Sequence, residues 1–347
     1  MDNIFAERQI RRDQESLQIW GKDWTNGLTV APSAIVFPET IEEVQALVSY
    51  ARSESIALVP SGGRTGLSGG AVASQGEVVV SFDRMNKILD FNPQDRLVKC
   101  EPGLVTAALQ AFAQDQGLFY PVDFASSGSS QIGGNVATNA GGIKVIRYGL
   151  TRSWVAGMKV VTGAGKILDC NAGLVKNATG YDFRHLMIGS EGTLGLICEL
   201  DIQLMAPPSP QVVMVLGVPK VVDLLSVLKC FNQATELSAF EFFSDLALQK
   251  VRTHRGLSAP LASAEENYAL LEFDEEDMAG VERAFETCVQ EGWVTDGVIS
   301  QSEAQAQGLW SLRDGISEGL AHCTPCKNDL SVRASDVTAF WQDVHRY

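Results

Sequence analysis

The sequence predicts an α+β protein of two parts, and three features of its 347 residues support this prediction. Most of the 32 glycines lie between residues 60 and 200. Prolines at positions 207, 208 and 210 then favour an extended linker, because each ring fixes its own φ. Beyond the linker, apolar runs of strand length alternate with segments of helical periodicity. We expect an N-terminal helical extension over residues 1–30, a glycine-rich domain over residues 31–207 and a regular α/β domain over residues 211–347.

The first glycine-rich stretch, PSGGRTGLSGGA, spans Pro60–Ala71. Glycine lets a ligand approach the backbone, and successive N–H groups in such a loop form a nest for an anion. A helix over Thr40–Ser53, opened by a Thr40 to Glu43 capping box, and a strand over Ile56–Val59 precede the loop. A strand over Val78–Phe82 follows it, without the helix that a Rossmann or Walker loop needs. The loop therefore favours a diphosphate and no nicotinamide cofactor, with a flexible surface hairpin as the alternative.

Two further glycine-rich clusters follow, over Tyr120–Gly149 and Ile188–Gly195. In the first of these, Asn135, Thr138 and Asn139 carry short side chains that could hydrogen-bond a polar ligand. Apolar residues interleave both its halves, which a flexible linker does not require. Three clusters separated by β-rich segments suggest one long ligand that contacts all of them. FAD has this length and carries a diphosphate.

The second domain is expected to alternate strands and helices as ferredoxin-like βαβ units do. The expected strands are Gln211–Val218, Ser238–Phe243, Asn267–Phe273, Trp293–Ser300 and, approximately, Asp329–Val332. The expected helices are Lys220–Gln233, Asp245–Arg252, Met278–Gln290, Glu303–Ala321 and the amphipathic Ser335–Tyr347. Because the sequence stops inside the last helix, we expect that the C-terminal part of this domain is missing. A naturally short protein with a docked final helix is the alternative.

Three motifs in a fixed order resemble the FAD-binding domain of the vanillyl-alcohol oxidase and p-cresol methylhydroxylase superfamily. They are PSGGRTGLSGG, PVDFASSGSSQIGGNVATNAGG and GYDFRHLMIGSEGTLGLI. Within that superfamily, the sequence most resembles the FAD-linked D-2-hydroxyacid dehydrogenases, which act on 2-hydroxyglutarate, lactate or glycolate. The resemblance implies that FAD is bound by Ser61, Gly62, Gly63, Arg64, Thr65, Gly66, Gly70, Ala71, Pro121, Gly133, Gly134, Asn135, Thr138, Asn139, Gly142, Glu191, Gly192 and Ile197. The first loop contains no histidine, so the FAD is expected to be noncovalent.

The second domain also contains motifs of this family. LWSLRDGISEGL resembles the helix whose arginine binds the substrate carboxylate, and CKNDLSV resembles the strand with a substrate-binding lysine. The resemblance therefore implies substrate binding by Arg313, Ser317 and Lys327, whereas no catalytic residue is identified. An ordinary helical ion pair with Asp314 or Glu318 is the alternative for Arg313.

Family members also carry an HGHxGDGNxH-type segment that binds a divalent metal, and this sequence does not contain it. None of the four histidines, His185, His254, His322 and His345, lies in such a motif. We therefore predict no metal ligand here and a divalent metal only in a longer form of the protein.

The resemblance implies an FAD-dependent oxidoreductase that oxidises a D-2-hydroxy acid to the 2-oxo acid by hydride transfer to flavin N5. The reduced flavin would then pass electrons to a quinone, an electron-transfer flavoprotein, a cytochrome or an iron–sulfur subunit. Two other functions remain open. One is a flavin oxidase of the same superfamily acting on another alcohol, and the other is a noncatalytic FAD-binding fragment.

Composition restricts the environment and the partners. A net charge of -15 argues against nucleic acid or an anionic membrane surface as a partner. The sequence shows neither a signal peptide nor a transmembrane stretch, so we expect a cytoplasmic protein. A homodimer is one oligomeric state that the sequence leaves open. Seven scattered cysteines fit reduced thiols, and the CxxC at Cys323 and Cys326 lacks the second such pair that a metal site would normally use.

Overall fold

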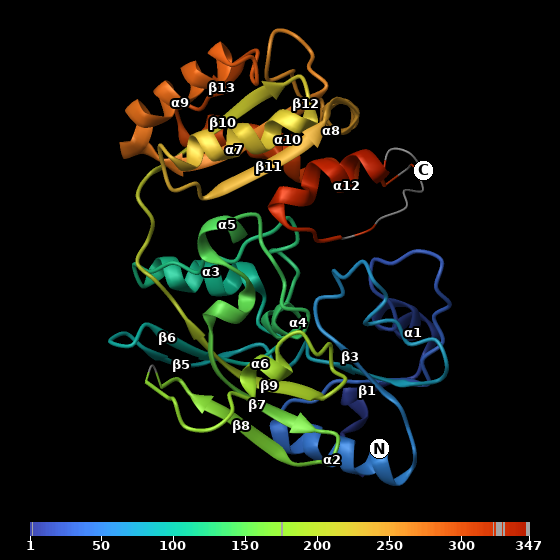
Figure 1. Cartoon of the computed structure of the whole chain (residues 1–347). Helices are drawn as coiled ribbons and strands as arrows, with labels where there is room; N and C mark the ends of the chain where they lie inside the picture. The colour runs from blue at the N-terminus through green and yellow to red at the C-terminus, as the bar shows by residue number, and fades with distance from the viewer. Residues whose placement is uncertain (2, 175, 322, 324–327, 329, 345–347) are drawn as a thin grey trace. The chain divides into compact units, whose positions relative to one another are not determined.

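The computed structural model describes residues 1, 3–174, 176–321, 323, 328 and 330–344. It divides into two compact units (Figure 1). Unit 1 comprises Met1–Gly142 and Gly149–Pro207, and unit 2 comprises Ile143–Tyr148 and the chain from Pro208 onward. The short segment 143–148 thus belongs by its contacts to unit 2, although both its neighbours in sequence belong to unit 1. Within the described part of the chain, no helix is long and apolar enough to cross a membrane.

Unit 1 contains a mainly parallel sheet in the order β1-β2-β4-β3. Its strands are β1 (Ile10–Arg11), β2 (Ala34–Val36), β3 (Leu58–Ser61) and β4 (Val78–Ser81). The short helices η1 (Glu7–Gln9) and α1 (Gln14–Trp20) flank β1 in sequence. Parallel strands require a crossover, which α2 (Ile41–Ser53) provides between β2 and β3. The predicted helix is confirmed, whereas the predicted strand Ile56–Val59 begins two residues later and ends at Ser61.

The capping of α2 follows the sequence prediction only in part. The Thr40 hydroxyl accepts from the Glu43 backbone N–H, but the Glu43 carboxylate accepts from the backbone N–H of Glu39 rather than that of Thr40. The apolar face of α2 buries Val44, Leu47 and Ala51, and the first two belong to the core of this sheet. No helix follows the first glycine loop before β4, as the sequence predicts.

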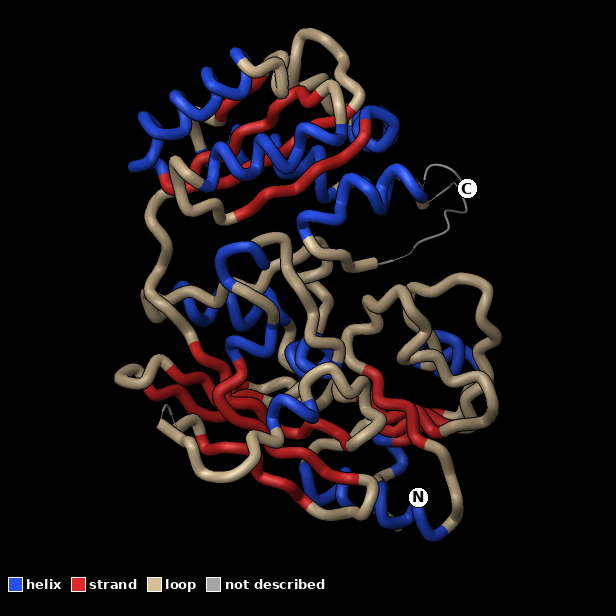
Figure 2. Tube along the Cα trace, in the orientation of Figure 1, coloured by secondary structure: helices blue, strands red, loops and turns tan. Residues whose placement is uncertain are grey.

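A second, antiparallel sheet of unit 1 has the order β5-β6-β9-β7-β8 (Figure 2). Its strands are β5 (Ile88–Asn92), β6 (Leu97–Cys100), β7 (Val155–Thr162), β8 (Ile167–Ala172) and β9 (Gly195–Gln203). Its core also contains residues of α3 (Thr106–Asp115) and α4 (Ile132–Ala137), among them Leu109, Ile132 and Val136. The remaining short helices are η2 (Thr151–Trp154) and α6 (Arg184–Met187). The sequence patterns did not predict α4, which forms inside the second glycine cluster.

Unit 2 contains an antiparallel sheet in the order β11-β12-β10-β13. The strands are β10 (Gln211–Val218), β11 (Ala239–Ser244), β12 (Asn267–Asp274) and β13 (Gly297–Ile299). Numbered along the chain this order is second, third, first, fourth, which is the ferredoxin-like arrangement and confirms the prediction. The sheet contributes to two hydrophobic cores. One core contains residues of η3 (Val221–Asp223), α7 (Leu224–Asn232) and α9 (Met278–Gln290), and η4 (Glu275–Asp277) directly precedes α9. The other core contains residues of α8 (Asp245–Arg255) and α10 (Glu303–Asp314).

Three expectations for unit 2 need correction. The predicted helix Glu303–Ala321 is interrupted at Gly315 and divides into α10 and α11 (Ile316–Gly319). Gly315 packs closely on α8, since an added Cβ would lie 2.8 Å from Arg255 Nε. The predicted strand Trp293–Ser300 shortens to β13. The predicted strand at Asp329–Val332 is wrong for Leu330–Val332, which form no regular element, while Asp329 lies outside the described residues.

The last predicted helix is present. It consists of η5 (Ala334–Asp336) and α12 (Val337–Val344), and residues 345–347 lie outside the described part. Trp341 of α12 packs edge-on against Phe242 of β11, with ring centroids 5.5 Å apart. This aromatic contact places Trp341 of α12 on the sheet of unit 2.

Candidate functional site

The first glycine loop follows β3 and lies against residues 129–134 of the second glycine cluster. At Gly63 an added Cβ would lie 2.1 Å from the Ser129 carbonyl oxygen, so only glycine fits. At Gly62 an added Cβ would lie 3.6 Å from the Gly134 Cα, whereas Gly134 itself faces open space. The first two clusters are therefore neighbours in unit 1, and Gly134 leaves room for a ligand to approach the backbone.

Arg64 has the left-handed backbone conformation in this loop, with φ of 59°. A residue with a Cβ adopts that conformation at a cost, and such residues recur in functional loops. Left-handed residues between right-handed ones also form the concave anion nests of phosphate-binding loops. The backbone of Arg64 therefore agrees with the diphosphate role that the sequence predicts for this loop.

The second cluster uses its glycines mainly for close packing. The Gly133 N–H donates to the Pro102 carbonyl at 2.7 Å, and an added Cβ at Gly142 would lie 2.4 Å from the Asp123 carbonyl oxygen. The amide side chain of Asn135 donates to the Thr106 hydroxyl at 2.7 Å, and the Thr138 hydroxyl donates to the Gly134 carbonyl at 3.0 Å. These side chains hold the protein's own chain in place.

Asn139 also serves the local structure. Its side-chain oxygen accepts from the Arg152 backbone N–H at 3.1 Å, and its own backbone is left-handed with φ of 50°. The polar side chains of this cluster thus shape the loop, and any contact that they make with a cofactor is additional to these bonds. Their predicted cofactor role stays a prediction.

The third glycine cluster contacts both of the other clusters. An added Cβ at Gly192 would lie 2.3 Å from Pro60 Cγ, and the Glu191 N–H donates to the Ala137 carbonyl at 2.9 Å. The Glu191 carboxylate lies 3.0 Å from where a Cβ on Gly70 would be. The three clusters therefore converge within unit 1, as one long ligand requires. Ile197 is different, because its side chain is buried in the core of the antiparallel sheet.

Two buried polar atoms at this convergence have no hydrogen-bond partner among the described residues. Ser61 is fully buried at the end of β3, and its hydroxyl is one of them. The other is the side-chain oxygen of Gln131, a residue only 6% exposed, which lies 3.5 Å from an added Cβ at Gly62. Buried polar groups are normally paired. A diphosphate oxygen could accept from Ser61 and a ribityl or ribose hydroxyl could donate to Gln131, so the residues fit FAD.

The other predicted cofactor residues occupy the same loops. Thr65 and Ala71 are half-buried, Gly66 is exposed and Pro121 is buried. Sequence reasoning missed Gln131 and the acidic residue Asp83, which follows β4 and accepts from Gln131 Nε2 at 2.8 Å. No sequence signal marks Asp83, because its partners lie far from it along the chain.

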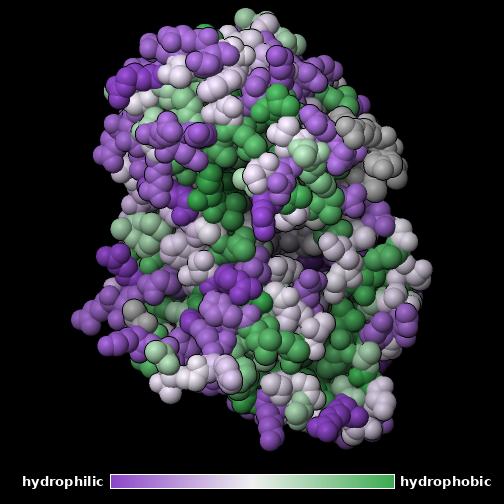
Figure 3. Space-filling view, viewed as in Figure 1, coloured by the Kyte–Doolittle hydropathy of each residue, from purple (hydrophilic) through white to green (hydrophobic). Residues whose placement is uncertain are grey.

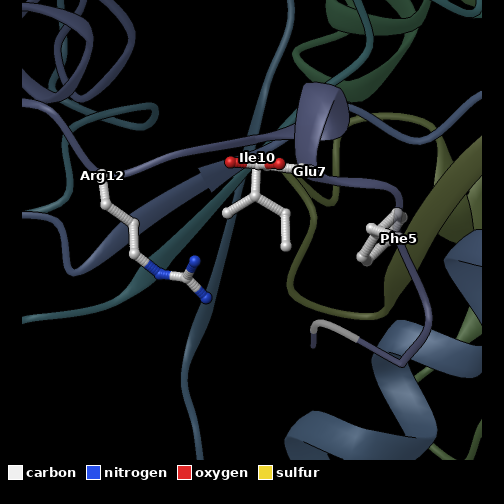
Figure 4. A pocket seen from close by; sticks show the side chains of 4 residues that line it. All are labelled: Phe5, Glu7, Ile10 and Arg12. Carbon is white, nitrogen blue, oxygen red and sulfur yellow. The ribbon is translucent and has the colours of Figure 1, made fainter.

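A surface pocket elsewhere in unit 1 is lined by Phe5, Glu7, Ile10 and Arg12 (Figure 4). None of these residues belongs to a glycine cluster, so we do not place the cofactor there. Large apolar side chains are also exposed near the first loop, among them Trp24, Leu28 and Leu67. Figure 3 shows hydrophobic residues among hydrophilic ones on the viewed face.

In unit 2, the predicted substrate residue Arg313 lies at the end of α10. Its Nε donates to the Glu241 carboxylate of β11 at 2.7 Å, and its side chain is 34% exposed. Glu318, one of the partners considered from the sequence, instead pairs with Arg255 at 2.6 Å. Ser317 is exposed on α11, beyond the break at Gly315. Lys327 lies outside the described residues, as do Cys326, His322 and His345.

Comparison with known families assigns both units. The family described as FAD binding domain matches residues 32–171, and the family described as FAD linked oxidases, C-terminal domain, matches residues 207–347. The chain is 57% identical to a D-2-hydroxyglutarate dehydrogenase of Stutzerimonas stutzeri, over 99% of this chain and 75% of that relative. A D-2-hydroxyglutarate dehydrogenase of Xanthomonas citri pv. viticola is 54% identical, over 96% of this chain and 71% of the relative. The chain belongs to the FAD-linked D-2-hydroxyacid dehydrogenases.

Solved structures agree on the fold of this dehydrogenase. An alkyldihydroxyacetonephosphate synthase structure has a TM-score of 0.75 at 18% identity, covering 99% of this chain and 68% of that one. A p-cresol methylhydroxylase structure has a TM-score of 0.75 at 14% identity, covering 92% of this chain and 70% of that one. The predicted fold, the FAD cofactor and the class of reaction, oxidation of a D-2-hydroxy acid, are thereby confirmed.

Proposed function

We propose that this dehydrogenase oxidises D-2-hydroxyglutarate to 2-oxoglutarate. Family membership establishes the class of reaction, and the choice of substrate rests on the names of relatives that are 57% and 54% identical to almost the whole chain. Identity at that level over both domain matches favours the same substrate in preference to lactate or glycolate. FAD, when bound, accepts the hydride from the substrate α-carbon.

We further propose that Arg313 binds a substrate carboxylate. Its guanidinium is planar and presents two donor edges, so a carboxylate can be bound by parallel hydrogen bonds. Glu241 takes the Nε donor and thereby fixes the plane of the group. The exposed hydroxyl of Ser317 and the ammonium of Lys327 are proposed to assist. A substrate with two carboxylates needs more than one residue that binds a carboxylate. The proposed roles of Ser317 and Lys327 beside Arg313 agree with this requirement.

The cofactor is proposed to be noncovalent. The loop Pro60–Ala71 contains no histidine, and its contacts with the other clusters come mainly from backbone atoms and glycines.

The reduced flavin needs an electron acceptor, for which a quinone, an electron-transfer flavoprotein, a cytochrome and an iron–sulfur subunit are the candidates. Within the described ranges, no group of three or more His, Cys, Asp or Glu side chains could hold a metal. A divalent metal in a longer form of the protein stays a prediction. A homodimer and a cytoplasmic location stay predictions.

Anaerobic flavin bleaching tests the substrate. The purified chain is mixed with D- and L-2-hydroxyglutarate, D- and L-lactate and glycolate, and the loss of flavin absorbance is followed. The Stutzerimonas stutzeri relative, treated in the same way, is the positive control. We expect fast bleaching by D-2-hydroxyglutarate alone.

Other results would select the other functions. Faster bleaching by D-lactate or glycolate would overturn the substrate assignment while leaving the reaction class intact. Rapid reoxidation of the bleached flavin by oxygen would indicate an oxidase. A yellow protein that no hydroxy acid bleaches, beside an active relative, would indicate that this chain binds FAD without catalysis.

A further inference from the structure

Asp83 receives hydrogen bonds from three separate segments of unit 1. Trp20, the last residue of α1, donates its indole N–H at 2.7 Å, and Gln131 donates its amide N–H at 2.8 Å. Arg64, inside the first glycine loop, donates from Nη1 at 3.3 Å to each carboxylate oxygen. The carboxylate is about a quarter exposed, so these bonds lie partly out of water. One side chain thus links the first glycine loop, the residue before α4 and the N-terminal extension.

Arg64 combines an unusual backbone conformation with side-chain hydrogen bonds to this carboxylate. Its left-handed conformation is disfavoured for a residue with a Cβ, so the surrounding contacts must hold it. Its guanidinium lies 5.8 Å from the Trp20 ring centre and also donates to the Gly62 carbonyl at 3.0 Å. Trp20 is itself held edge-on against Phe37, with centroids 5.3 Å apart. Asp83 therefore ties the strained residue of the loop to a packed aromatic pair.

Asp83 also fixes which way the Gln131 amide points. An ionised carboxylate only accepts hydrogen bonds, so it must face the NH₂ group and leave the amide oxygen on the other side. That oxygen is buried, has no partner among the described residues and points toward Gly62. Ser61, with its own unpartnered buried hydroxyl, directly precedes that glycine. The orientation that Asp83 imposes is therefore the one that presents an acceptor to the glycine clusters.

The N-terminal extension contacts the same loop directly. The Trp24 backbone N–H donates to the Gly66 carbonyl at 3.0 Å, and the Ala73 N–H donates to the Gly21 carbonyl at 3.0 Å. Asp23, only 7% exposed, has one carboxylate oxygen without a partner among the described residues, 3.5 Å from where a Cβ on Gly66 would be. Residues 20–25 therefore pack on the loop rather than extending away from it.

We propose that Asp83 is the positioning residue of the flavin site, which holds the first glycine loop, Gln131 and the N-terminal segment in the arrangement that retains FAD. This role rests on the proposed noncovalent binding of FAD. Asp83 acts through Arg64 and Gln131 and need not touch the cofactor itself. Its loss should release the three segments from one another and leave the hydrophobic cores unchanged.

The test compares two carboxylates of unit 1. Asp83→Asn removes the charge and replaces an acceptor by a donor, whereas Glu39→Gln removes a carboxylate that pairs with Arg8 and Arg84 and touches no glycine cluster. FAD affinity and dissociation rate are measured by flavin fluorescence, and thermal unfolding is measured with and without FAD. We expect Asp83→Asn to weaken FAD binding about tenfold or more, as loss of charge-assisted bonds implies. Glu39→Gln should leave FAD binding within about twofold of the parent.

Trp20→Phe provides a second variant in case Asp83→Asn does not fold. It keeps an aromatic ring against Phe37 and Arg64 and removes the N–H donor together with the five-membered ring that carries it, so FAD should dissociate several-fold faster, with a small loss of stability without FAD because Trp20 also packs on the core. Parental FAD affinity and dissociation in Asp83→Asn, or equal losses in Asp83→Asn and Glu39→Gln, would overturn the proposal. If Asp83→Asn does not fold, parental FAD dissociation in Trp20→Phe would overturn it.

Failure of the noncovalent proposal is recognised separately. In that case acid-precipitated parent protein stays yellow, and the flavin-to-protein ratio of the purified variants then replaces the dissociation measurement. A reduced ratio in Asp83→Asn but not in Glu39→Gln would support the role of Asp83. Equal ratios would overturn it.

Discussion

The glycine clusters of unit 1 and the polar end of the sheet in unit 2 are built in opposite ways. The clusters depend on the absence of side chains, as at Gly63, where a Cβ would lie 2.1 Å from Ser129. The sheet of unit 2 instead carries ion pairs, with Arg147 bound to Asp274 at 2.8 Å and Lys144 to Glu272 at 2.8 Å. Where the structure depends on close backbone contacts, a single added side chain should abolish ligand binding. Where it depends on ion pairs, each substitution should lower the stability by a limited amount, and the stability should change with pH.

The ion pairs of unit 2 also show what anchors segment 143–148. Glu272 is only 4% exposed, and its second oxygen accepts from the Trp310 indole N–H at 2.9 Å. Arg147 donates to both oxygens of Asp274 and to the Ser238 hydroxyl at 3.0 Å. A buried carboxylate without a cation is costly, so these contacts tie Lys144 and α5 (Val145–Tyr148) to β12 and to Ser238, which directly precedes β11. The segment continues the second glycine cluster in sequence but is held by unit 2.

The largest effect is expected from Gly63→Val. A branched side chain cannot fit against the Ser129 carbonyl, so the loop must move and FAD binding should be lost. The measurement is the flavin-to-protein ratio after purification. Gly163→Ala is the matched control, since Gly163 lies in the turn between β7 and β8, outside the glycine clusters, and a Cβ there meets nothing within 4 Å. Full flavin content in Gly63→Val would remove this loop from the cofactor site.

Gly134→Ala sharpens the same comparison. The added methyl group meets no protein atom within 4 Å, so stability without FAD should hardly change. If the open space beside Gly134 belongs to the cofactor, FAD affinity should fall several-fold. Titration of the FAD-free protein measures this, and unchanged affinity would place the cofactor elsewhere.

In unit 2, Lys144→Met should be the most destabilising ion-pair change. It leaves Glu272 buried without its cation, and breaking a buried pair costs about 3 kcal/mol of the free energy of unfolding. Urea unfolding measures the loss. The double variant Lys144→Met with Glu272→Met should recover most of it, because no buried charge remains. Equal losses in the single and double variants would show that the pair itself is not the cause.

Arg313→Lys should weaken hydroxy-acid binding by about 2 kcal/mol, because lysine keeps the charge and loses the planar fork. FAD content should not change, and Arg313→Ala should weaken binding further. Rapid-mixing flavin reduction against substrate concentration separates binding from hydride transfer. Arg255→Lys, which alters the pair with Glu318, is the control. If Arg313→Lys binds the hydroxy acid with the parental affinity, Arg313 does not bind the substrate carboxylate and its ion pair with Glu241 has only a structural role.

The smallest effect concerns pH. The hydrogen bonds from Arg147 hold the pKa of Asp274 below its ordinary value of 3.8, despite the opposing effect of burial. The pair therefore contributes stability at neutral pH, where the carboxylate is ionised in both folded and unfolded chains. This contribution should fall as the pH drops toward 3.8 and vanish below the lowered pKa. Urea unfolding of Asp274→Asn across this range should show a shallower dependence on pH than the parent, and an equal slope would contradict the assignment.

Local patterns in the sequence predicted the regular elements well. β10 and α9 have the predicted bounds, and α2 begins directly after Thr40, because periodicity and capping depend on neighbours a few residues apart. The glycine motifs predicted the FAD family for the same reason, since each loop is a continuous stretch. The lack of a helix after the first loop is equally local, and it excludes the common nucleotide folds.

Partners that lie far apart along the chain were decided only by the tertiary structure. Asp83 meets Gln131 across 48 residues, Arg313 meets Glu241 across 72 and Arg147 meets Asp274 across 127. Neither member of such a pair indicates the other in the sequence, because long polar side chains can reach many partners and only the fold selects one. The sequence by itself therefore determined the cofactor family and most elements, since these are encoded by adjacent residues. The fold alone decided that Asp83 joins three segments and that segment 143–148 belongs to unit 2, since packing brings those charges together.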